Sequence, residues 1–85
     1  MPKVVLTHAV VDVDRWLNGK ADRAAALGSN VVDYVAEDGS NKIAITADVD
    51  EVAALQAMLA APPSEVQAQM DEHGVVPPIT TYIQA

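Results

Sequence analysis

The chain of 85 residues contains no cysteine and no phenylalanine, and it has only one tryptophan and two tyrosines. Without cysteine there is no disulfide framework, no thiolate metal site and no cysteine nucleophile. Basic residues are also scarce, since five Lys and Arg stand against twelve Asp and Glu, and none follows Lys42. Because phosphate contacts need clustered basic side chains, this charge pattern excludes binding to nucleic acid and docking on an anionic membrane surface.

Long apolar runs are absent as well. No run approaches the roughly 20 residues that span a bilayer, and no signal peptide opens the chain, so we expect a cytoplasmic protein. The length predicts a single domain over residues 1–85. Hydrophobic residues make up 51% of the chain, but most of them are alanine and valine. A core of such small side chains buries little area, and we therefore expect further burial against a partner.

The periodicity of apolar residues predicts four strands and two main helices. The expected elements are a strand over 3–11, a helix over 12–27, strands over 30–36 and 42–47 joined by a hairpin loop, a helix from about 48 to 61, a shorter helix over 64–73, and a strand over 79–84. The first helix is expected to run unbroken through Asn18 and Gly19 and to hold Trp16 against the sheet.

Several polar residues stand where helices are predicted to begin. Asp12 is the expected N-cap of the first helix, and two pairs, Asp48 with Glu51 and Ser64 with Gln67, have the spacing of a capping box. The resulting order, β-α-β-β-α-β, predicts an α+β domain of the ferredoxin-like type with a four-stranded, antiparallel-type sheet. We expect the first and third strands to be central and parallel, because a helix lies in the connection between them.

Both faces of the first predicted strand are apolar. Val4, Leu6 and Val10 lie on one face, and Val5, Ala9 and Val11 lie on the other. Two helices cover only one face of a four-stranded sheet, so the second face would remain as a large exposed apolar patch. We therefore expect a homodimer that forms sheet to sheet.

Segments throughout the chain resemble the dimeric α–β barrel superfamily, ferredoxin-like proteins whose two sheets close into a shared barrel. The matching segments are 8–16 (HAVVDVDRW), 48–52 (DVDEV), 59–62 (LAAP), 70–75 (MDEHGV) and 77–79 (PPI). The resemblance implies a homodimeric barrel with an internal pocket. It does not imply one activity, because this superfamily hosts unrelated chemistries.

The branch of this superfamily that degrades haem has a defined set of residues, which the chain lacks. His8 stands where that branch has an amide, residues 46–48 lack its tryptophan, and His73 lies about one turn beyond the position of its haem ligand. We therefore expect no haem. The two distant histidines have no metal-binding spacing, so no metal or other cofactor is expected either.

His8 is the main candidate for chemistry. If its face of the strand lines the barrel, the imidazole binds an acidic or phenolic ligand or acts as a general base. The structural alternative is a histidine that bonds to a neighbour or contacts the partner chain. The position of His73 at the end of a predicted helix is explained by the favourable interaction of a cationic imidazole with the helix dipole. The alternative is that His73 lies at the mouth of the barrel. Tyr34 and Tyr82 either line the pocket or pack along edge strands.

Three functional hypotheses follow. The first is a small-molecule binding protein with His8, Tyr34, His73 and Tyr82 as ligand-binding residues in the barrel pocket. The second is a cofactor-independent monooxygenase or cyclase-type enzyme with His8 as its base. The third is a structural or interaction module without a ligand. The first two require an internal cavity with polar groups, whereas the third requires a filled barrel.

Overall fold

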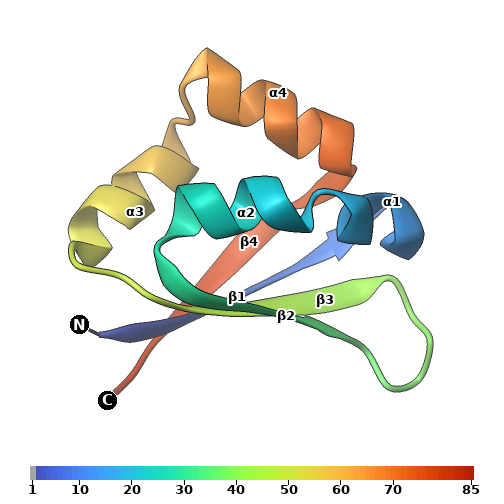
Figure 1. Cartoon of the computed structure of the whole chain (residues 1–85), viewed down its shortest axis with the longest axis horizontal. Helices are drawn as coiled ribbons and strands as arrows, with labels where there is room; N and C mark the ends of the chain where they lie inside the picture. Colours follow the sequence, from blue (N-terminus) through green and yellow to red (C-terminus); the bar gives the residue numbers. More distant parts are fainter. Residues whose placement is uncertain (1) are drawn as a thin grey trace.

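Four helices lie on one side of a four-stranded antiparallel sheet (Figure 1). The computed structural model describes residues 2–85. Its elements are β1 (Lys3–Val10), α1 (Val13–Asn18), α2 (Lys20–Leu27), β2 (Ser29–Val35), β3 (Lys42–Asp48), α3 (Val52–Ala60), α4 (Ser64–His73) and β4 (Val75–Ile83). This is the α+β architecture that the sequence predicts. Within residues 2–85, none of the helices has the length and apolarity to cross a membrane.

The strand order is β2-β3-β1-β4, which is compatible with a ferredoxin-like fold. The prediction that β1 and β3 are central is confirmed, but the prediction that they are parallel is wrong. Leu6 of β1 faces Ile45 of β3 in an antiparallel register. The reason is topological. The helical connections join β1 to β2 and β3 to β4, and in each case the two joined strands are parallel and separated by one other strand. The strand inserted between such a pair pairs antiparallel with both neighbours.

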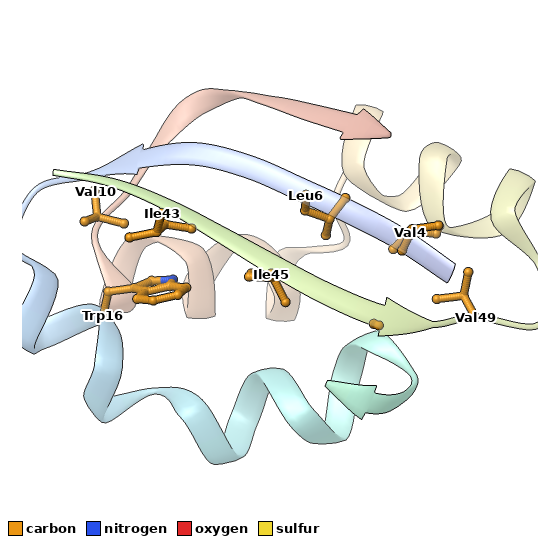
Figure 2. Close-up of a cluster of buried hydrophobic side chains, with 9 residues drawn as sticks. Val4, Leu6, Val10, Trp16, Ile43, Ile45 and Val49 are labelled. Atoms are coloured by element: carbon orange, nitrogen blue, oxygen red, sulfur yellow. The ribbon is translucent and has the colours of Figure 1, made fainter. Parts of the chain in front are cut away.

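The core lies between the helices and the sheet. Every second residue of β1 and β3 is buried, which reflects the period of two along a strand. Figure 2 shows Val10 and Ile43 beside the indole of Trp16, and Val4 at the other end of the same strands. The buried hydrophobic residues are Val4, Leu6, Val10, Trp16, Ile43, Ile45, Ala47, Val49 and Leu55. Trp16 is fully buried, so its predicted place against the sheet is confirmed.

The first predicted helix is interrupted at Gly19. Asp12 caps α1 as expected, because its carboxylate accepts a hydrogen bond from the backbone nitrogen of Arg15 at 3.2 Å. The chain then leaves α1 and enters α2 at Gly19, which is the C-cap of the first and the N-cap of the second. The expectation of one continuous helix is therefore wrong.

The two predicted capping boxes do not form. Asp48 is the last residue of β3, where its carboxylate accepts from Asn30 at 2.8 Å and pairs with Lys3 at 3.1 Å. Helix α3 begins instead after Glu51, which makes no side-chain cap. Ser64 is already inside α4, whose N-cap is Pro63. Asp48 thus bonds to Asn30 and Lys3, which are distant in sequence, and does not cap a helix.

The last strand begins earlier than predicted. It starts at Val75, directly after Gly74 ends α4 in the left-handed conformation with φ 72°. It therefore includes Pro77 and Pro78, and the register with β1 shifts close to them, between Thr7 and Ala9. Prolines are tolerated here because β4 is an edge strand.

No helix covers the opposite face of the sheet in the described residues (Figure 1). We call it the open face. The register places on it Val5, Thr7, Ala9, Val32, Tyr34, Ala44, Thr46, Val76, Thr80 and Tyr82. Tyr82 is 58% exposed, Tyr34 49% and Val32 44%. The expected apolar second face is thus present.

Candidate functional site

A cavity of about 70 Å³ lies between the sheet and the helical layer. Both layers contribute to its lining, which is mainly apolar. The lining residues are Leu6, His8, Trp16, Arg23, Ala26, Leu27, Ile45, Met58, Leu59, Val66, Gln69, Met70, His73, Val75 and Ile79. We call this space the inner cavity.

His8 enters the inner cavity from the middle of β1, on the same face as Leu6. Its Nδ1 lies 2.7 Å from the carbonyl oxygen of Ala9. A carbonyl only accepts, so Nδ1 carries the proton in this bond and Nε2 keeps its lone pair when the ring is neutral. Burial lowers the pKa of His8, and the nearby Arg23 charge lowers it further against the raising effect of the Ala9 bond. The neutral ring is therefore favoured at pH 7.

Trp16 meets His8 from the helical side. The two ring centroids are 6.3 Å apart and the ring planes are nearly perpendicular, at 84°. The indole nitrogen lies on the ring edge that faces the strands (Figure 2). This nitrogen is buried and has no hydrogen-bond partner. Buried donors are normally satisfied, so this one is an exception that calls for a ligand or a water.

Arg23 completes this side of the inner cavity. Its guanidinium carbon lies 3.9 Å from the centre of the Trp16 ring, a cation–π contact. It donates to the carbonyl oxygen of Trp16 and forms an ion pair with Asp33 of β2 at 3.0 Å. Both side chains are buried, with 8% and 3% of their surfaces exposed. The pair thus fixes α2 to the sheet and leaves no net charge at the cavity wall.

Sequence reasoning missed this ion pair, although each partner leaves a signal. Arg23 is seven residues after Trp16, which is the helical spacing of the core stripe. Asp33 alternates with Val32 and Tyr34 along β2, so it lies on the same face of the strand as Val31 and Val35. When a basic and an acidic residue both occupy inward positions, an ion pair between them is expected, because a buried charge requires a partner of opposite charge.

His73 reaches the inner cavity from the end of α4. Its Nε2 lies 3.5 Å from an Asp22 carboxylate oxygen. The ring packs directly on Gly19, where an added Cβ would fall 2.3 Å from Nε2. This close approach explains why glycine stands at the break between α1 and α2. Arg15 also reaches α4, donating to the carbonyl oxygens of Asp71 and Glu72 at 2.6 Å.

A groove of about 580 Å³ adjoins the inner cavity, and we call it the β4 groove. It runs between α3, α4 and β4 and is lined in part by Pro77 and Pro78. The two spaces share four wall residues, namely Leu59, Met70, Val75 and Ile79. Side-chain movement at these residues would therefore join the two spaces.

The four residues predicted to bind a ligand are divided between the two faces of the sheet. His8 and His73 both line the inner cavity. Tyr34 and Tyr82 lie on the open face, where their side chains are about half exposed. The inner cavity is thus on the helix side of the sheet, away from the face that a dimeric barrel would enclose. Within residues 2–85, no three His, Asp or Glu side chains are close enough together to hold a metal ion.

Comparison with protein-family models, curated proteins and solved structures finds no match. What the inner cavity can bind is therefore inferred from the residues that line it. These provide an apolar space, an unpartnered indole N–H, an imidazole lone pair and a neutralised guanidinium.

Proposed function

We propose that the protein binds a small, mainly apolar organic molecule in the inner cavity, with the β4 groove as its entrance. The observation that carries this proposal is the continuity of the two spaces through Leu59, Met70, Val75 and Ile79. Ligand sites are typically concave, apolar and equipped with a few polar groups. The inner cavity meets this description, and the groove supplies the volume that it lacks alone.

The residues at the boundary suit an adjustable entrance. Met58 and Met70 are both half-buried and unbranched, and such side chains change rotamer readily to fit an irregular ligand. In the described residues, no side-chain hydrogen bond ties α3 or α4 to a strand. Outward movement of α3 therefore breaks apolar contacts with the sheet, whereas α4 is also joined to α1 by the Arg15 hydrogen bonds and to α2 by the His73–Asp22 contact.

Trp16 is the only tryptophan and lines the inner cavity, so its fluorescence reports occupancy directly. Titration with propylbenzene is expected to change this emission and to raise the melting temperature. Leu59→Phe, which narrows the shared wall, should weaken the response severalfold. Leu17→Phe is the matched control, because Leu17 is outside the cavity lining and should leave binding unchanged. The proposal fails if propylbenzene and its hydroxylated analogue both leave the emission unchanged.

We also propose that two copies associate through their open faces. The interior of this face is made of valine, alanine, threonine and tyrosine, and its lysines, Lys3 and Lys42, stand at opposite ends of the central strands. A monomer would leave this apolar surface in water. Sheet-to-sheet packing would bury it and would supplement a core built largely from small side chains.

Sedimentation is the test of this dimer. We expect twice the mass of one chain at micromolar concentration. Thr7→Arg places a charge in the middle of the open face and should give monomers, whereas Ala53→Arg on the exposed surface of α3 should not. A native protein that sediments as a monomer would rule the dimer out while leaving ligand binding to be judged by its own test.

A further inference from the structure

Two ring nitrogens of residues that line the inner cavity, one on Trp16 and one on His8, have no hydrogen-bond partner among the described residues. One is Nε1 of Trp16, a buried donor. The other is Nε2 of His8, which is left as an acceptor because Nδ1 is engaged with the carbonyl oxygen of Ala9. The two rings belong to different layers and meet edge to face at 6.3 Å. A donor and an acceptor are therefore carried by two neighbouring rings, both of which line the mainly apolar inner cavity.

The charges around these atoms restrict what they can bind. Arg23 is the cation nearest to them, and it is already neutralised by Asp33 and bonded to the carbonyl oxygen of Trp16. The other basic side chain of the wall besides His8, His73, lies 3.5 Å from the Asp22 carboxylate. An anionic ligand would therefore find no unpaired counter-charge beside Trp16 and His8, and a cationic one would meet Arg23 at close range. Because an unpaired charge is costly to bury, the ligand has to be uncharged.

A hydroxyl group is the simplest uncharged complement to a donor and an acceptor, since it provides one of each. We propose that the ligand of the inner cavity is an uncharged compound with one hydroxyl group, phenolic or alcoholic. The hydroxyl oxygen accepts from Nε1 of Trp16, and its proton is donated to Nε2 of His8. This inference rests on the proposed binding function and adds the chemical class of the ligand.

The volumes define the orientation of such a ligand. The inner cavity, about 70 Å³, is smaller than the ~150 Å³ that accommodates benzene in an engineered protein cavity. The hydroxyl end therefore occupies the inner cavity, and the apolar body extends past Leu59 and Met70 toward the β4 groove.

The test compares three probes that share a propylphenyl body. Calorimetric titrations with 4-propylphenol, propylbenzene and 4-propylbenzoate vary only the polar end. We expect 4-propylphenol to bind about tenfold or more tightly than either of the others, the effect of placing its hydroxyl on two partners. The single indole N–H resonance should move downfield with 4-propylphenol and not with propylbenzene.

Two variants locate the preference. Trp16→Phe removes the donor and keeps a ring, and His8→Phe removes the acceptor. In each variant, the affinity for 4-propylphenol should be at most about twice the affinity for propylbenzene. The ratio of the two affinities is used because a change in cavity volume affects both probes alike.

The outcomes separate this inference from the binding function. Equal affinities for 4-propylphenol and propylbenzene would overturn the hydroxyl assignment and leave cavity binding intact, and so would a preference that survives both variants. Benzoate binding as tight as phenol binding would overturn the restriction to uncharged ligands. Binding of no probe at all would remove the proposed function itself.

Discussion

The two halves of the helical layer are attached to the sheet in different ways. Helices α1 and α2 are fixed by the fully buried Trp16 and by the Arg23–Asp33 ion pair, which crosses from helix to strand. Helices α3 and α4 bury Leu55 and His73 and, among the described residues, form no ion pair with a strand. The polar contacts of α4 are with α1 and α2, through Arg15 and through His73 with Asp22. Their remaining contacts with the sheet come from half-buried aliphatic and methionine side chains.

This difference gives the inner cavity one fixed wall and one adjustable wall. The fixed wall holds the polar atoms, whose geometry has to be maintained for recognition. The adjustable wall holds Met58, Leu59 and Met70, of which Leu59 and Met70 also line the β4 groove. Elements that move on binding generally come from the less stable parts of a structure. Mutations in the two walls should therefore have unequal costs.

The largest effect is expected for Trp16→Ala. The change removes a fully buried side chain together with its contact to Arg23, and it should lower the free energy of unfolding by about 3–5 kcal/mol. Met70→Ala in the adjustable wall should cost less than about 2 kcal/mol, because Met70 is only half-buried. Urea denaturation measures both values. Equal losses would remove the distinction between the walls.

The second prediction tests the ion pair that fixes α2. Asp33→Asn leaves Arg23 buried without its counter-charge and should cost about 3 kcal/mol. Lys3→Met is the control, since Lys3 is paired with Asp48 at the surface and its loss should cost less than about 1 kcal/mol. The double variant Arg23→Met with Asp33→Leu should recover much of the loss. A cost below 1 kcal/mol for Asp33→Asn would show that α2 is held by other contacts.

The smallest effect is expected from pH, acting on His8 at the fixed wall. Its pKa in the folded protein lies below the unfolded value of about 6.5, chiefly because of burial and further because of the Arg23 charge. Between these two pKa values the unfolded chain binds more protons, so stability is complete above pH 6.5 and decreases as the pH falls. Urea midpoints at pH 7.5 and 5.5 should show this decrease. The variant His8→Gln should show a smaller one, and an identical decrease in the variant would assign the effect to another group.

Local sequence patterns predicted the elements of this fold well. The alternation along β1 and β3, the hairpin after β2 and the apolar position of Trp16 all depend on near neighbours in sequence, and the structure confirms them. The strand directions were predicted wrongly because a connecting helix relates β1 to β2 and not to the strand beside it.

The site was harder to predict, because it depends on contacts between distant residues. Gly19 looked like a tolerated defect in a helix, but it accommodates the ring of His73, which is far away in sequence. Likewise, both histidines were singled out separately, and only the fold places them in one cavity. Tyr34 and Tyr82 were grouped with them because their place on the other face depends on the register of β2 and β4.

The pairing of β1 with β4 sets the order in which this chain can fold. Gln84 donates its backbone N–H to Lys3, so the sheet joins residues at nearly opposite ends of the chain. Such non-local pairing slows folding compared with a helical bundle of the same length. During synthesis at ~5–20 residues per second, the valine-rich β1 would wait several seconds for its last partner. Chaperone occupancy on the emerging chain should therefore be concentrated on this first strand.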